Sequence, residues 1–130
     1  PVPAGLDGKS LAPILRGQAE GVRDTIFLAY RDCQRAVRRG RWKLLRYPQV
    51  DKTQLFDLEA DPFETKDLAA GPAQAGRVKE LMAHMTEQQK LFGDSQPLTV
   101  PNPKPAAITL DYYKSPPPPA AKKGRKGANP

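Results

Sequence analysis

The sequence has little of what most enzyme centres are built from. It holds one cysteine, Cys33, and one histidine, His84. A single cysteine excludes a disulfide within the chain. No second histidine or cysteine lies near His84 at the spacing of metal ligands, and no base partner lies beside Cys33 in the sequence. We therefore expect no catalytic residue and no metal site in this chain, with Cys33 a partly buried thiol and His84 a solvated surface residue.

Long apolar runs are absent as well. No stretch approaches the roughly 20 apolar residues that a membrane-spanning helix needs, so we expect no membrane contact. The chain begins without an initiator methionine, a basic leader or an apolar leader. We expect it to be a fragment of a longer protein, which leaves its own compartment unknown.

The charge of the chain is uneven. The formal net charge is +7 over 130 residues, and residues 93–130, with six Lys/Arg and two acidic residues, contribute +4 of it. A hydrophobic pattern extends only over about residues 8–92. A core of that size is small, and an apolar face that seeks a partner is expected.

Four short strands can be identified in the pattern. The segment 34–47 predicts a hairpin that reverses at Gly40, because runs of β-branched and aromatic residues flank a glycine that is free to adopt a positive φ. Residues 25–30 are apolar on both faces, which predicts a strand inside the sheet. Residues 54–58 form a fourth strand with short connections. The expected sheet is an antiparallel meander.

A helix is predicted to follow the strands. Pro72 suits its first turn and Gly93 its C-terminal stop. One stripe of its surface is apolar: Val78, Leu81, Met82, Met85 and Phe92. The predicted fold is α+β, a four-stranded antiparallel sheet with a C-terminal helix packed on one face, followed by a Pro-rich basic tail. The predicted parts are a linker and short helix over 1–23, the α+β subdomain over 24–92, and a disordered tail over 93–130.

Five motifs occur in a characteristic order. They are GLDGKSL at residues 5–11, QRAVR at 34–38, WKLLRY at 42–47, LFDL at 55–58 and DPFETKDLA at 61–69. In this order they resemble the C-terminal subdomain of the sulfatase family, in its arylsulfatase A and N-sulfoglucosamine sulfohydrolase branch. The resemblance covers residues 1–92 and implies a small four-stranded antiparallel sheet with one helix, docked on a larger α/β catalytic domain.

The resemblance also implies an activity for the parent protein, the hydrolysis of sulfuric esters or sulfamates. The family's nucleophile is a formylglycine made from cysteine in a Cys-x-Pro-x-Arg motif, and it works beside a calcium ion. Here Cys33 is followed by Gln34, Arg35, Ala36 and Val37, so it does not fit that motif. We expect the formylglycine and the calcium in the catalytic domain outside this chain, and a periplasmic, secreted or lysosomal parent.

A polar cluster stands at the start of the predicted hairpin. It consists of Arg31, Asp32, Gln34 and Arg35. Planar guanidinium groups bind sulfate-like anions with two parallel hydrogen bonds. We expect these residues to line the entrance for a sulfated substrate, for example a glycan. The alternative is that they form ion pairs with Asp24, Asp57 or the rest of the parent.

Two further patterns have competing explanations. Asp57, Glu59 and Asp61 alternate like metal ligands but lack the glycine and distal glutamate of a calcium loop, so we predict that they cap turns. The basic run over 122–126 lies beside four prolines. It supports an alternative to the sulfatase interpretation, in which the chain is a small interaction protein that binds polyanions or nucleic acid through its tail. Nucleic acid is the weaker choice, because no stacking aromatics alternate with the cations.

Overall fold

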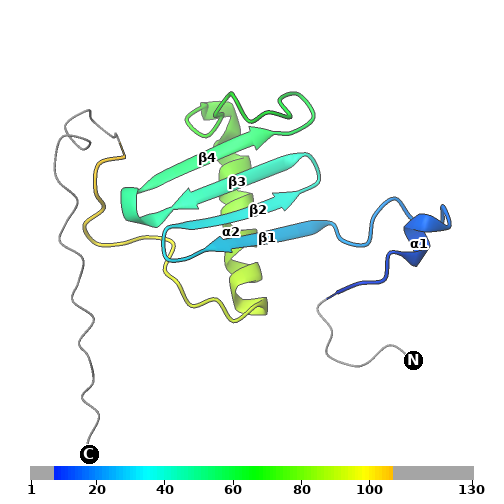
Figure 1. The fold of residues 1–130 in the computed structure, drawn as a ribbon. Coiled ribbons are helices and arrows are strands. Elements are labelled where there is room, and N and C mark those ends of the chain that lie inside the picture. The colour runs from blue at the N-terminus through cyan, green and yellow to red at the C-terminus, as the bar shows by residue number, and fades with distance from the viewer. Residues whose placement is uncertain (1–7, 107–130) are drawn as a thin grey trace, which may run out of the picture.

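The computed structural model describes residues 8–106. The elements are α1 (Ala12–Leu15), β1 (Thr25–Tyr30), β2 (Gln34–Arg39), β3 (Trp42–Tyr47), η1 (Pro48–Val50), β4 (Lys52–Asp57), η2 (Pro72–Gln74) and α2 (Ala75–Leu91). The four strands form one antiparallel sheet in the order β1-β2-β3-β4. The predicted meander is confirmed (Figure 1).

The central hairpin forms as the sequence predicts. Arg39 of β2 pairs with Trp42 of β3, so that Gly40 and Arg41 make the reversal. Gly40 has a φ of +56°, a conformation that residues with a Cβ rarely adopt. Further along the ladder, Val37 lies opposite Leu44 and therefore on the same face of the sheet.

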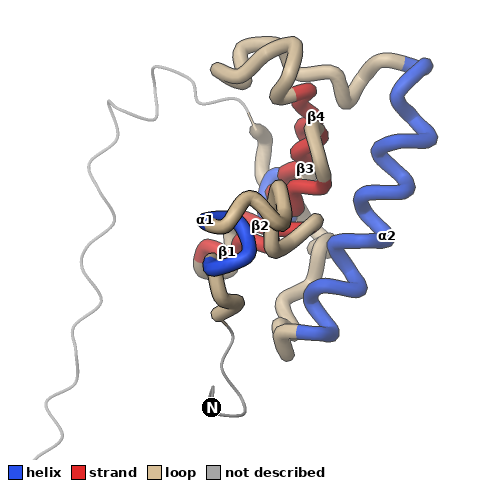
Figure 2. Tube along the Cα trace, turned by 90° about the vertical axis from the view of Figure 1, so that its right-hand side faces the viewer, coloured by secondary structure: helices blue, strands red, loops and turns tan. Residues whose placement is uncertain are grey.

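Helix α2 covers one face of the sheet. Pro72 opens the short helix η2, which leads into α2, and Gly93 follows the last turn with a φ of +65°. Figure 2 shows α2 alongside one side of the strands. The buried core between helix and sheet consists of Val37, Leu44, Leu55, Leu81 and Met85. The predicted α+β arrangement is confirmed.

Strand β1 is an edge strand, and the prediction that it lies inside the sheet is wrong. Its Phe27 faces the core, but Ile26, Leu28 and Tyr30 on the opposite face are 45%, 51% and 58% exposed. A strand that is apolar on both faces is usually covered on both. Here the second apolar face is uncovered in the part of the chain that the structure describes.

On that second face of the sheet, part of the surface is buried and part is exposed. Ala36, Leu45 and Phe56 form a second buried cluster, with Tyr47 and Leu58 packed against it. The buried half therefore belongs to β2, β3 and β4, and the exposed half belongs to β1.

The contacts of the folded unit continue beyond the predicted boundary at residue 92. Leu98 packs against the core cluster, and the backbone N–H of Lys104 donates to the carbonyl of Gln49 at 2.8 Å. The remainder of the expected tail, residues 107–130, lies outside the described residues. Within residues 8–106, no helix is both long enough and apolar enough to cross a membrane.

Candidate functional site

The turn between β1 and β2 carries the predicted substrate-binding residues. It is formed by residues 31–33, between the last residue of β1 and the first of β2. Arg31 has a φ of +47°. The N–H of Cys33 donates to the carbonyl of Tyr30 at 3.3 Å, and the Cys33 thiol donates to the same oxygen at 3.4 Å. The turn is thus closed at its base, and Cys33 is the partly buried thiol that the sequence predicts.

Arg31 and Asp32 are exposed on this turn. The Arg31 guanidinium carbon lies 5.6 Å from the centroid of the Tyr30 ring, within the range of a cation–π contact. Asp32 accepts a long hydrogen bond of 3.5 Å from the amide of Gln49. An exposed guanidinium beside an exposed aromatic ring is chemically able to bind an anionic group on a sugar.

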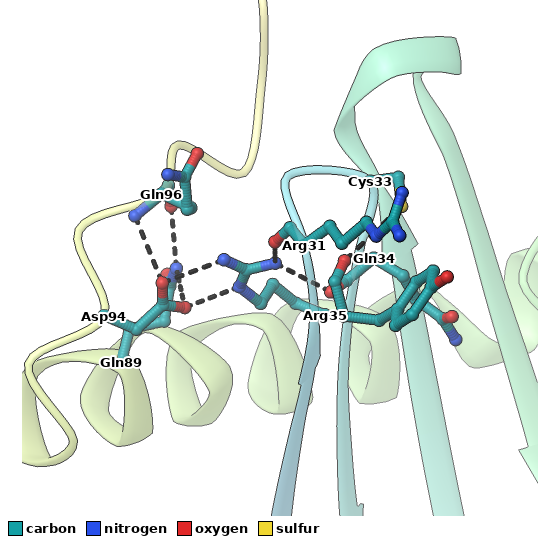
Figure 3. A network of polar contacts seen from close by, with 8 residues as sticks. Arg31, Cys33, Gln34, Arg35, Gln89, Asp94 and Gln96 are labelled. Atoms are coloured by element: carbon teal, nitrogen blue, oxygen red, sulfur yellow. Dashed lines mark hydrogen bonds and ion pairs between the residues drawn. The ribbon is translucent and has the colours of Figure 1, made fainter. Parts of the chain in front are cut away.

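Arg35 differs from these two residues, because its side chain is only 3% exposed. Its Nε donates to Asp94 Oδ2 at 2.5 Å and its Nη2 to Asp94 Oδ1 at 2.9 Å (Figure 3). The remaining nitrogen, Nη1, donates to the carbonyls of Arg31 at 2.6 Å and Gln34 at 2.8 Å. The ion-pair partner of Arg35 is therefore Asp94, rather than Asp24 or Asp57.

Asp94 is a functional candidate that sequence reasoning missed. It follows the helix stop at Gly93, where the sequence reads as the start of a Pro-rich tail. Its carboxylate accepts hydrogen bonds from the Gln89 amide at 3.0 Å and the Gln96 backbone N–H at 3.3 Å, besides those from Arg35. The Arg35 guanidinium, followed by these donors, holds the pKa of Asp94 well below its usual range. The carboxylate is thus ionised at any pH at which the chain would work.

The structure places the four predicted residues at the same turn, but they differ in how far they are exposed. Arg31 and Asp32 lie exposed on the turn, while Gln34 is half-buried as the first residue of β2. Arg35 lies behind them and is bonded to the backbone of the turn. Only the exposed pair is placed for direct contact with a molecule from outside.

His84 is not the solvated residue that the sequence predicts. Its side chain is 17% exposed, and its Nε2 lies 2.9 Å from the hydroxyl of Thr25. Its Nδ1 lies 3.2 Å from a carboxylate oxygen of Glu87. His84 therefore connects α2 to the edge strand β1.

The predicted turn caps are confirmed for Asp57 and Asp61 but not for Glu59. Asp57 Oδ1 accepts hydrogen bonds from the backbone N–H groups of Glu59 and Ala60, and Asp61 Oδ2 accepts one from that of Lys66. The carboxylate of Glu59 instead forms an ion pair with Arg41 at 2.9 Å. Arg41 forms a two-pronged ion pair with Asp57 and is the main cause of its lowered pKa.

The residues that the structure describes do not fit a catalytic metal or a formylglycine. Among residues 8–106, no group of three or more His, Cys, Asp or Glu side chains is placed to hold a metal ion. Cys33 lies in a turn and lacks the proline and arginine of the maturation motif. The basic run over 122–126 lies outside the described residues.

The fold defines a class: a small α+β subdomain in which, among residues 8–106, nothing covers the apolar part of the sheet face that β1 forms. Comparison with known proteins identifies it further. The family described as N-sulphoglucosamine sulphohydrolase, C-terminal, matches residues 1–91. The chain belongs to this family, and the resemblance to sulfatases is confirmed.

Individual relatives agree with the family. The N-acetylglucosamine-6-O-sulfatase of Bacteroides thetaiotaomicron is 29% identical in an alignment 108 residues long, and the match covers 74% of this chain and 19% of that protein. The choline-sulfatase of Rhizobium meliloti is 54% identical over 37 residues, which are 28% of this chain and 7% of that protein.

Solved structures give the same result. One is a protein in complex with its substrate D-glucosamine-2-N,6-O-disulfate, with a TM-score of 0.64 at 25% identity, covering 75% of this chain and 22% of that one. Another is a 2-O GAG sulfatase, with a TM-score of 0.62 at 29% identity, covering 72% and 22%. The chain spans about a fifth of the length of these relatives.

Proposed function

We propose that this chain is the non-catalytic C-terminal subdomain of a sulfatase whose catalytic domain lies elsewhere in the parent protein. The parent hydrolyses sulfuric esters or sulfamates, and the formylglycine and the calcium ion belong to its catalytic domain. The support is the family match over residues 1–91 together with the span of about a fifth of the relatives. By the same family resemblance, the parent works in the periplasm, outside the cell or in a lysosome.

The subdomain packs on the catalytic domain through the β1 half of its uncovered sheet face. This exposed apolar strip is the observation that carries the proposal. Ile26, Leu28 and Tyr30 lie at alternate positions of one edge strand and are all about half exposed. A single layer of helix leaves the other sheet face to be buried by another layer. Apolar side chains that are contiguous and exposed are typical of a protein interface.

The β1–β2 turn lies at one end of this strip, and we assign to it a role in substrate entrance. Arg31 and Asp32 project from the end of β1, next to Tyr30 on the docking face. The substrate class is a sulfated glycan, in line with the D-glucosamine-2-N,6-O-disulfate and the GAG named for two similar structures. The Arg31 guanidinium binds an anionic group of that glycan, and Asp32 selects against misplaced anions by repulsion.

The test of this proposal uses the full-length parent and this chain side by side. The parent is expected to hydrolyse a sulfated glycan oligosaccharide, whereas the chain alone turns over no sulfate ester. In the parent, Arg31→Ala is expected to raise the KM for the glycan about tenfold, the loss of one charge-assisted hydrogen bond of about 1.4 kcal/mol.

The matched control is Arg39→Ala, at the other end of β2. Arg39 is also exposed, and its ion pair with Glu80 is a long one of 3.8 Å. Its replacement is expected to leave the glycan KM unchanged. Turnover by the isolated chain would disprove the non-catalytic role, and an unchanged KM in Arg31→Ala would disprove the role in substrate entrance.

A further inference from the structure

The conformation of Arg31 requires an external support. Its φ of +47° lies in the left-handed region, which residues with a Cβ adopt only when the surroundings hold them there. The carbonyl of Arg31 accepts a hydrogen bond of 2.6 Å from Arg35 Nη1. The same nitrogen donates to the carbonyl of Gln34 at 2.8 Å. One nitrogen of Arg35 thus connects Arg31, where the turn begins, with Gln34, where β2 begins.

Asp94 determines where this nitrogen points. The carboxylate forms a bidentate ion pair with Arg35, in which it accepts hydrogen bonds from Nε at 2.5 Å and from Nη2 at 2.9 Å. Because a guanidinium is planar and rigid, fixing two of its nitrogens fixes the third. Nη1 is therefore directed at the backbone of the turn, as Figure 3 shows.

Asp94 is itself held in place from the helix side. The amide nitrogen of Gln89, a residue that is 7% exposed, donates to Asp94 Oδ2 at 3.0 Å and to the carbonyl of Gln96 at 2.7 Å. The backbone N–H of Gln96 donates to Asp94 Oδ1 at 3.3 Å. The end of α2, the segment that follows it and the β1–β2 turn thus form one hydrogen-bonded unit.

We infer that Asp94 is a positioning residue for recognition of the sulfated substrate and acts through Arg35 on the turn that carries Arg31. This inference rests on the substrate-entrance role proposed above. Asp94 orients Arg35, Arg35 fixes the carbonyls on both sides of the turn, and the fixed turn holds the Arg31 guanidinium against the Tyr30 ring. A cation that is ordered before binding loses less conformational freedom when the anion arrives.

A change at Asp94 is expected to affect only those substrates that extend beyond the catalytic centre. A contact on this subdomain acts on a remote part of the substrate, such as a neighbouring sulfated sugar. A small aryl sulfate has no such part, so the turn contributes nothing to its binding. Comparing the two substrates therefore separates positioning from a general loss of structure.

The experiment is Asp94→Asn in the full-length parent, with KM and kcat measured on a sulfated glycan oligosaccharide and on 4-methylumbelliferyl sulfate. Asparagine keeps the shape of aspartate and removes its charge. We expect the glycan KM to rise about fivefold, somewhat less than for Arg31→Ala, because the cation is retained but less ordered. The glycan kcat and both constants for the aryl sulfate are expected to stay within twofold.

The matched control is Asp57→Asn. Asp57 forms the same kind of two-pronged ion pair, with Arg41, but at the opposite end of the hairpin. Its replacement weakens the fold without touching the turn, so the glycan KM is expected to stay at the wild-type value. An equal rise of the glycan KM in both variants, or a loss of aryl sulfate turnover in Asp94→Asn, would show a merely structural role and overturn the inference.

A double variant distinguishes this inference from the proposed function itself. If Asp94 acts through Arg31, Asp94→Asn raises the glycan KM no further in an Arg31→Ala background. A rise with Arg31→Ala and none with Asp94→Asn overturns the positioning role alone. An unchanged KM in Arg31→Ala overturns the entrance role.

A milder variant serves if Asp94→Asn does not fold. Gln89→Leu removes one donor from Asp94 and leaves the Arg35 pair in place. The expected rise of the glycan KM is about twofold, again without a change for the aryl sulfate. A folded Gln89→Leu parent with the wild-type glycan KM would count against the inference.

Discussion

Leu28 in β1 lies directly opposite Ala36 in β2, yet Leu28 is 51% exposed while Ala36 is only 1% exposed. Both side chains point to the sheet face that α2 does not cover. The boundary between the buried and the exposed half of this face therefore runs between these two strands. An exposed leucine at such a boundary is placed to continue an apolar core into a neighbouring domain.

Replacing Leu28 with lysine tests the docking face. In the isolated 130-residue chain, Leu28→Lys is expected to change the free energy of unfolding by less than about 0.5 kcal/mol, because the side chain is already half in water. In the full-length parent, the same change buries a charge in the interface and is expected to destabilise it by about 2 kcal/mol or more. Urea unfolding of the chain and thermal unfolding of the parent measure the two effects.

The control for that substitution is Leu91→Lys. Leu91 is 71% exposed and lies at the end of α2, on the other side of the sheet. It is expected to leave both the chain and the parent unchanged. Equal effects of Leu28→Lys in the chain and in the parent would argue against docking through β1.

The Arg35–Asp94 pair predicts a defined pH dependence of stability. The native pKa of Asp94 is lowered by Arg35, whereas an unfolded aspartate titrates at about 3.9. A lowered native pKa means that the pair contributes its full stability above the unfolded pKa and loses it as the pH falls towards the native pKa. In the isolated chain, Asp94→Asn is expected to cost about 3 kcal/mol at pH 5 to 7, because it leaves the Arg35 cation buried without its counter-ion.

Urea unfolding followed by fluorescence of Trp42, the chain's single tryptophan, measures this difference. The gap between wild type and Asp94→Asn is expected to be constant from pH 7 to pH 5 and to narrow by pH 3. A gap that stays the same down to pH 3 would show that the charge of Asp94 is not what stabilises the network.

The core between sheet and helix predicts a large effect at Leu55. This residue is fully buried in β4 and packs in the cluster with Leu44 and Leu81. Leu55→Ala removes apolar contacts and leaves a cavity, so a loss of about 3 kcal/mol in the free energy of unfolding is expected. Leu15→Ala, at a position that is 85% exposed in α1, is the control and should cost almost nothing. Similar losses in both variants would contradict this core.

Local patterns in the sequence were sufficient to predict the hairpin and the helix. The reversal at Gly40 and the helix stop at Gly93 depend on neighbouring residues only, and both glycines have the expected positive φ. The five ordered motifs were sufficient for the family. The burial of β1 could not be predicted from local patterns. An edge strand with an exposed apolar face has the same sequence pattern as a strand inside a sheet, and only the position of the strand in the sheet distinguishes the two.

The candidate site was predictable only in part, for a similar reason. The polar cluster of the turn is local and could be recognised, but the role of Arg35 depends on a carboxylate 59 positions away. Asp94 stands in a segment whose prolines indicate a tail, and no local signal marks it as part of the fold. His84 was missed in the same way, because its partner Thr25 is also 59 positions away.

A pair of glycines provides the last prediction. Apart from the adjoining backbone of the chain itself, neither Gly40 nor Gly76 has an atom within 4 Å of the place where a Cβ would stand, so in both an alanine would meet open space. The backbone conformation alone then decides whether alanine is tolerated.

Gly40 has a φ of +56°, where a Cβ costs about 1 kcal/mol, so Gly40→Ala is expected to destabilise the chain by that amount. Gly76 lies in the first turn of α2 with an ordinary helical backbone, so Gly76→Ala is expected to stabilise it by about 0.5 kcal/mol. Urea unfolding of both variants should therefore shift in opposite directions, and shifts of the same sign would show that one of these two backbone conformations is not the one the chain adopts.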